Sequence, residues 1–77
     1  MNTSEVVNDL LVRQFGVAEA EIRYETPLRN LRMDSLALEE LRVLIEDRLD
    51  VDLEEVPLTS RDTVGTLVSA VDGKVAV

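Results

Sequence analysis

The chain has 77 residues, the size of one small domain, and 45% of them are apolar, which is enough to form a core. Sixteen acidic residues against eight basic ones give a net charge of −8, so nucleic acid and anionic membrane surfaces are poor partners. The sequence contains neither Cys nor His, which excludes disulfides, thiolate metal sites and the usual Ser-His or Cys-His catalytic pairs. We therefore expect a protein that is not itself an enzyme.

No apolar run is long enough to span a bilayer, and the N-terminal residues lack the basic and apolar segments of a signal peptide. We therefore expect a cytoplasmic, monomeric protein with a single domain over residues 1–77 and a loose tail over about 73–77. Asp50-Val51-Asp52 resembles part of a calcium loop but lacks the required glycine and closing glutamate, so no metal site is predicted.

Apolar residues at helical spacing predict a first helix that is capped by Asn2 or Thr3 and ends at Gly16. Val7 and Leu11, one turn apart, belong to its apolar face. Periodicity is weak from residue 17 to residue 34, so a long ordered loop is predicted there. The apolar side chains expected to anchor this loop to the core are Ile22, Tyr24, Leu28 and Leu31.

A second helix is predicted from Ser35 to about Arg48, with Asp34 as its N-cap. A turn of about 100° per residue separates its side chains into two faces. The core face contains Leu38, Leu41, Leu44, Ile45 and Leu49. The opposite face contains Leu36, Glu40, Val43 and Asp47. Apolar residues framed by acids are typical of a contact surface, although single exposed apolar residues are also normal.

The segment from residue 51 to residue 58 is predicted to be a short connection, with one helical turn at 54–56 before Pro57. A last helix is predicted over about 62–71, capped by Thr59, Ser60 or Asp62 and weakened by Gly65 by about 1 kcal/mol. The expected fold is an all-α bundle of three main helices and one short helix, with a long loop between the first two.

Ser35 stands at a helix start directly after a long loop, where its hydroxyl is expected to be exposed. A phosphate on this oxygen would lie beside free N–H groups and the positive end of the helix dipole. No residue of the chain can activate the hydroxyl, so a partner enzyme would have to supply the chemistry. The other interpretation is that Asp34 and Ser35 only begin a helix.

The run Leu31-Arg32-Met33-Asp34-Ser35-Leu36 resembles the attachment motif of acyl carrier proteins. The agreement continues through Glu39-Glu40-Leu41, Ile45-Glu46-Asp47, Val51-Asp52-Leu53 and Asp62-Thr63-Val64, and upstream through Phe15-Gly16-Val17 and Ala20-Glu21-Ile22. The resemblance implies a four-helix bundle in which 4′-phosphopantetheine is attached covalently to Ser35, with Asp34 as the adjacent acid. The arm would carry acyl or aminoacyl groups as thioesters.

The resemblance also implies which residues partner enzymes contact. They are Leu36, Glu40, Val43 and Asp47 on the second helix, with Glu39, Glu46 and Glu55 at the margins. The implied partners are a phosphopantetheinyl transferase, an acyltransferase or a ligase that loads acyl or aminoacyl groups, and a ketosynthase or other acyl-processing enzymes.

The sequence departs from the family pattern at three arginines. The family usually has Gly at the position of Arg32, and Arg42 and Arg48 add positive charge to the second helix. These differences favour a stand-alone carrier of polyketide or antibiotic biosynthesis. A fatty-acid carrier and an aminoacyl or peptidyl carrier remain open. So does a helical adaptor without a prosthetic group, whose outer face would bind a partner helix.

Overall fold

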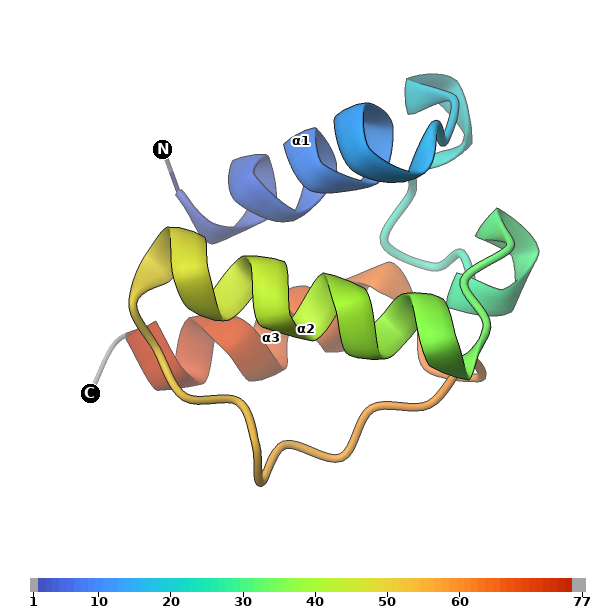
Figure 1. Ribbon diagram of the computed structural model, residues 1–77. Coiled ribbons are helices and arrows are strands. Elements are labelled where there is room, and N and C mark those ends of the chain that lie inside the picture. The colour runs from blue at the N-terminus through green and yellow to red at the C-terminus, as the bar shows by residue number, and fades with distance from the viewer. Residues whose placement is uncertain (1, 76–77) are drawn as a thin grey trace.

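A computed structural model describes residues 2–75 and consists of helices joined by ordered loops (Figure 1). The three α-helices are α1 (Thr3–Phe15), α2 (Ser35–Leu49) and α3 (Val64–Val75). Two short 3-10 helices, η1 (Glu19–Glu21) and η2 (Leu28–Leu31), lie in the loop between α1 and α2. The all-α fold predicted from the sequence, with three main helices and a long first loop, is confirmed. The single short helix expected in the second loop is replaced by two 3-10 helices in the first loop.

The three α-helices surround one hydrophobic core to which every α-helix and both long loops contribute. Residues with no more than 1% exposure include Leu11 in α1, Leu28 in the first loop, Ile45 in α2, Leu53 in the second loop and Leu67 in α3. α1 packs against both α2 and α3. The core therefore holds the loops as well as the helices in fixed positions.

The first two α-helices are capped at the residues that the sequence indicates. The Asn2 side-chain oxygen accepts a hydrogen bond from the Glu5 N–H at 2.8 Å, and Gly16 ends α1 with a φ of 68°. Asp34 accepts a hydrogen bond from the Ala37 N–H at 2.9 Å and so begins α2. Side-chain caps of this kind satisfy backbone donors that have no partner inside the helix.

The cap of α3 differs from all three predicted residues. The Thr63 hydroxyl accepts a hydrogen bond from the Thr66 N–H at 3.1 Å, and α3 begins at Val64. Asp62 instead accepts from the Thr59 N–H at 2.8 Å, which closes the preceding turn. The cap thus lies one residue beyond the predicted candidates because the Asp62 carboxylate is engaged in that turn.

The loose tail predicted over about 73–77 is wrong for residues 73–75, which continue α3 as far as Val75. The Thr3 hydroxyl donates a hydrogen bond to the Asp72 carboxylate at 2.9 Å, which ties the end of α3 to the start of α1. Lys74 in the last turn also complements the negative end of the helix dipole. Residues 76 and 77 of the predicted tail lie outside the described residues.

The segment at 54–56 forms a turn rather than the helical turn that was predicted. The Val56 N–H donates to the Leu53 carbonyl at 3.0 Å, and Pro57 follows immediately. Proline cannot continue a helix and restricts the residue before it, so the turn ends there.

One of the side chains predicted to anchor the first loop is exposed, and the loop backbone makes a close contact that was not predicted. Leu28 and Leu31 are buried as predicted, but Tyr24 is 62% exposed. The Tyr24 backbone anchors the loop instead, because its carbonyl accepts a hydrogen bond from the Gly65 N–H at 2.9 Å. A Cβ atom at Gly65 would lie 3.0 Å from this carbonyl oxygen, so glycine allows the approach.

Within residues 2–75, no helix combines the length and the apolar character that crossing a membrane would require.

Candidate functional site

Ser35 is the first residue of α2, and its side chain is exposed. Asp34 caps the helix through the Ala37 N–H, so the serine is not needed as the cap. The Ser35 hydroxyl has no hydrogen bond with any residue between 2 and 75. The hydroxyl is therefore open to solvent and available to a group from outside the described residues.

The backbone around Ser35 suits a linked phosphate. The Ala37 N–H binds the Asp34 carboxylate and the Leu38 N–H binds the Asp34 carbonyl at 2.9 Å. The N–H groups of Ser35 and Leu36 have no acceptor within the described part of the chain. Open N–H groups at the positive end of a helix stabilise a nearby phosphate, so the residues present fit a phosphodiester on Ser35.

The residues on both sides of Ser35 hold it in a fixed position. Met33, two residues before it, is 1% exposed, and Leu38, three residues after it, is 4% exposed. Arg32 ends η2 in the left-handed conformation with a φ of 64°, and its N–H donates to the Arg29 carbonyl at 3.1 Å. Ser35 is thus an exposed residue on a rigid support.

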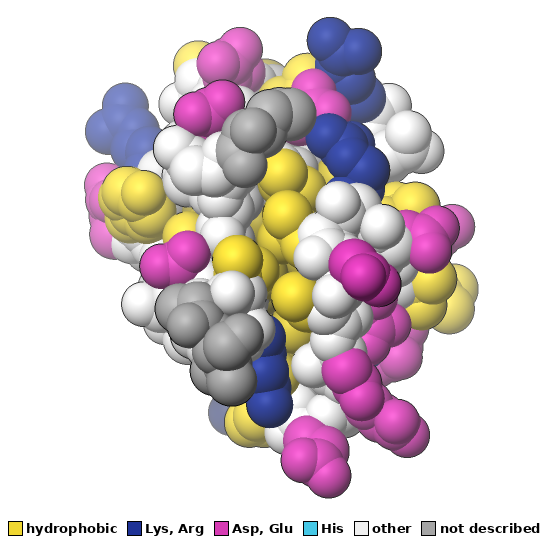
Figure 2. Space-filling model, turned by 90° about the vertical axis from the view of Figure 1, so that its left-hand side faces the viewer, with side chains coloured by type: hydrophobic (Ala, Val, Ile, Leu, Met, Phe, Trp, Pro, Cys, Tyr) yellow, Lys and Arg dark blue, Asp and Glu magenta, His cyan; other side chains and the backbone are white. Residues whose placement is uncertain are grey.

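The outward face of α2 carries the residues that helical geometry predicts. Leu36 is 78% exposed and Val43 is 57% exposed, and the acids between and beyond them are exposed as well. We call Leu36, Glu40, Val43 and Asp47 the outer stripe. In Figure 2, which views the molecule from the end where both termini lie, acidic side chains gather on the right-hand side, where α2 lies.

The three marginal residues occupy different environments. Glu39 is exposed beside Arg42, with 3.7 Å between its Oε1 and the Arg42 Nε. Glu55 is exposed in the second loop. Glu46 is half-buried, and its Oε2 accepts a hydrogen bond from the Leu53 N–H at 2.7 Å. Glu46 therefore contacts the second loop and does not join the outer stripe.

Arg42 has a structural role that the sequence did not reveal. Its side chain is only 14% exposed, and its guanidinium donates to the Leu53 carbonyl and, at 3.1 Å, to the Glu54 carbonyl. We call Arg42 and Glu46 the loop latch, because both fix the backbone of the second loop to α2. The one available signal was their spacing of one turn on the flank of the core face.

The positive charge expected on α2 does not lie in the outer stripe. Arg42 is directed to the second loop, and Arg48 pairs with Asp9 of α1 at 3.4 Å. Asp9 also pairs with Arg13 at 2.8 Å. The outer stripe therefore keeps its acidic frame.

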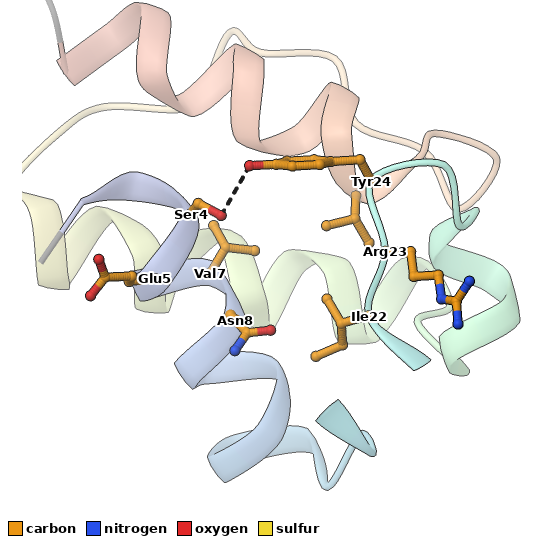
Figure 3. Close-up of a pocket in the computed structure, with 8 residues that line it drawn as sticks. Ser4, Glu5, Val7, Asn8, Ile22, Arg23 and Tyr24 are labelled. Atoms are coloured by element: carbon orange, nitrogen blue, oxygen red, sulfur yellow. Dashed lines mark hydrogen bonds between the residues drawn. The ribbon is translucent and has the colours of Figure 1, made fainter. Parts of the chain in front are cut away.

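A hollow of about 230 Å³ lies apart from Ser35, between α1, the first loop and the start of α3 (Figure 3). Its lining includes Val7, Ile22 and Val64, and the hydroxyls of Tyr24 and Ser4 are 3.3 Å apart at one side. Within residues 2–75, no three His, Cys, Asp or Glu side chains are placed to hold a metal ion. Ser35 itself is on an open surface.

The family profile described as "Phosphopantetheine attachment site" matches residues 5–71 of the chain. The match covers most of α1, the first loop, α2, the second loop and most of α3, and it includes Ser35. Members of this family are non-catalytic carriers, and the attachment site implies a covalent 4′-phosphopantetheine. The match spans most of the chain, and it agrees with an exposed serine at a helix start that is capped by the acid before it. The chain therefore belongs to the phosphopantetheine attachment site family of carrier proteins.

Proposed function

We propose that Ser35 carries the 4′-phosphopantetheine and that the chain delivers acyl or aminoacyl groups to partner enzymes. The observation that supports this is the exposed Ser35 hydroxyl, left without a hydrogen-bond partner among the described residues because Asp34 caps α2. When bound, the arm supplies a thiol that holds acyl groups as thioesters. The chain itself positions Ser35 and contributes no base, so the transferase must accept the serine proton.

We propose the outer stripe as the surface on which partner enzymes dock. Its two exposed apolar side chains would supply the contact area, and its acids would meet Arg and Lys of the partner. The expected partners are the phosphopantetheinyl transferase, an acyltransferase or loading ligase, and a ketosynthase or other acyl-processing enzyme. We expect the contacts with each partner to be small and brief, and to weaken as salt is added.

For the pathway, we propose polyketide-type biosynthesis, with a fatty-acid or an aminoacyl carrier as the alternatives. The main support for this pathway is Arg32, which is exposed at a position where the family usually has Gly. Arg42 and Arg48 give less support, because they contact other parts of the chain and do not lie in the outer stripe. Mass spectrometry of the group bound to the protein from its native cells tests this. A β-ketoacyl chain is expected, whereas a saturated acyl chain or an amino acid would contradict it.

Attachment is tested by intact mass after incubation with coenzyme A and a phosphopantetheinyl transferase of broad specificity. The protein is expected to gain one phosphopantetheine, and Ser35→Ala is expected to gain none. Ser69→Ala, which removes an exposed hydroxyl from α3, is the matched control and should be modified like the original protein. A folded protein that gains no mass would contradict the proposal and favour a helical adaptor without a prosthetic group.

Docking is tested with Glu40→Arg and Asp47→Arg. Each is expected to lower kcat/KM for loading by about tenfold, because like charges then face each other across the interface. Each should change the free energy of unfolding by less than about 0.5 kcal/mol, since both side chains are exposed. Glu19→Arg, the same charge change in η1, is the control. Equal loading by all these variants would disprove docking on the outer stripe.

A further inference from the structure

Three exposed arginines lie at the same end of the molecule as Ser35. They are Arg29, Arg32 and Arg61, which we call the loop arginines. None of them forms an ion pair with another residue of the described chain. By contrast, Arg13 and Arg48 pair with Asp9 and Arg42 belongs to the loop latch. Arg23 also has no ion pair within the described residues, but it lies at the hollow of Figure 3.

Backbone hydrogen bonds bring the loop arginines together from two distant segments. The Leu28 N–H donates to the Asp62 carbonyl and the Arg29 N–H donates to the Ser60 carbonyl, both at 2.8 Å. This pairing sets Arg61 beside η2, and η2 leads directly into α2 (Figure 1). The loop arginines therefore border the helix start that carries Ser35.

The local charge differs in sign from that of the whole protein. Two aspartates, Asp34 and Asp62, lie in the same stretches, and each accepts a backbone N–H. Three arginines against two aspartates give residues 28–34 and 59–63 together a net charge of +1, whereas the chain as a whole has −8. Outside these stretches, Glu21 of the first loop lines a hollow together with Arg32. The acidic outer stripe begins immediately after Ser35. Ser35 thus lies between a basic surface and an acidic one.

The conformation of Arg32 adds a second observation. Its φ of 64° is one that glycine adopts freely and that strains a residue with a long side chain. The exposed Arg32 side chain forms no ion pair within the described residues that would offset this strain. Strained residues of this kind gather at sites that act on a ligand or partner.

We propose that the loop arginines are a second contact surface, which binds an acidic patch on the partner protein that docks on the outer stripe. This inference rests on the docking function proposed above. Opposite charges on the two sides of Ser35 would fix the orientation of the carrier, because a half turn about Ser35 would place like charges together. A protein surface can present both signs side by side, whereas the outer stripe would repel nucleic acid or an anionic membrane.

The charge surface is tested on the protein without its arm, by NMR titration at low salt with hexaglutamate and hexalysine peptides. Hexaglutamate is expected to shift the resonances of residues 28–33 and 59–63, and hexalysine those of residues 36–47. Shifts from hexaglutamate that are absent, or confined to the region of Lys74, would overturn the proposal. Shifts at the loop arginines from adenosine 3′,5′-bisphosphate but not from hexaglutamate would also overturn it, in favour of a phosphate ligand.

The effect on docking is tested in the loading assay that Glu40→Arg is expected to slow. Arg61→Glu and, separately, Arg29→Glu are each expected to lower kcat/KM by about fivefold, with a weaker effect at high salt. Lys74→Glu makes the same charge change at the other end of the molecule and should stay within about twofold of the original protein. Arginine variants that load like Lys74→Glu would overturn the proposal. If Glu40→Arg has no effect on loading, the proposal that partners dock on the outer stripe is disproved. The peptide titration then still tests whether the loop arginines bind an acidic partner.

Discussion

The loop that leads into α2 and the loop that leaves it are held to the bundle by different groups. The first loop (residues 16–34) contains two 3-10 helices and is held by buried leucines and by backbone hydrogen bonds, including those to Ser60 and Asp62 of the second loop. The second loop (residues 50–63) contains no helix, and two charged side chains of α2, the loop latch, bind its backbone near Leu53. Near Leu53 the second loop is therefore sensitive to changes in charged residues of α2, whereas the first loop depends on its buried leucines and on its backbone pairing with residues 60–62.

The largest effect is expected for Leu28→Ala in the first loop. Leu28 has 0% exposure, so the change should lower the free energy of unfolding by about 2–4 kcal/mol through lost burial and the cavity that remains. Urea denaturation measures this. Leu36→Ala, at a position that is 78% exposed, should stay within about 0.5 kcal/mol. Equal losses for the two variants would show that Leu28 does not anchor the first loop.

A smaller effect, confined to the second loop, is expected for Arg42→Ala. Two carbonyls lose a charged donor, so the free energy of unfolding should fall by about 1–3 kcal/mol. Amide hydrogen exchange should become faster at residues 53–56 and change little at 28–33. The control is Arg61→Ala, whose side chain is exposed and has no ion pair within residues 2–75. Equally faster exchange in both loops would remove the distinction between them.

The smallest effect, and one of opposite sign, is expected for Arg32→Gly at the end of the first loop. Glycine adopts a φ of 64° without strain, so the free energy of unfolding should rise by about 0.5–1 kcal/mol. Arg29→Gly, inside η2 and without a positive φ, should instead lower stability. The melting temperatures of both variants measure this. A loss of stability in both would mean that Arg32 is not strained.

The parts of the fold that depend on neighbours in sequence could be predicted from the sequence. Asn2, Gly16 and Asp34 are strong local signals for helix ends, and each does what its residue type suggests. The outward position of Leu36 and Val43 follows from helical period alone. A helix start after a long loop left two interpretations of Asp34 and Ser35, and the resemblance to acyl carrier proteins made Ser35 the candidate site.

The parts that depend on distant backbone groups could not be predicted. Arg42 looked like a surface charge because its acceptors lie eleven and twelve residues away, in a segment without periodicity. The left-handed conformation of Arg32 ends η2, which backbone pairing with Ser60 and Asp62 holds in place. The local preferences of a residue carry no information about such distant contacts, so the conformation of the loops could not be predicted.

The hydrogen bond between Thr3 and Asp72 has a consequence for joining this carrier to other proteins. It places the first turn of α1 beside the last turns of α3, and in Figure 1 both termini lie at the end of the bundle remote from the start of α2. A fusion partner or surface anchor attached at either terminus would therefore leave the Ser35 end unobstructed. The contact between Thr3 and Asp72 also makes the chain suited to circular permutation, with a linker joining α3 to α1 and new termini opened in the second loop.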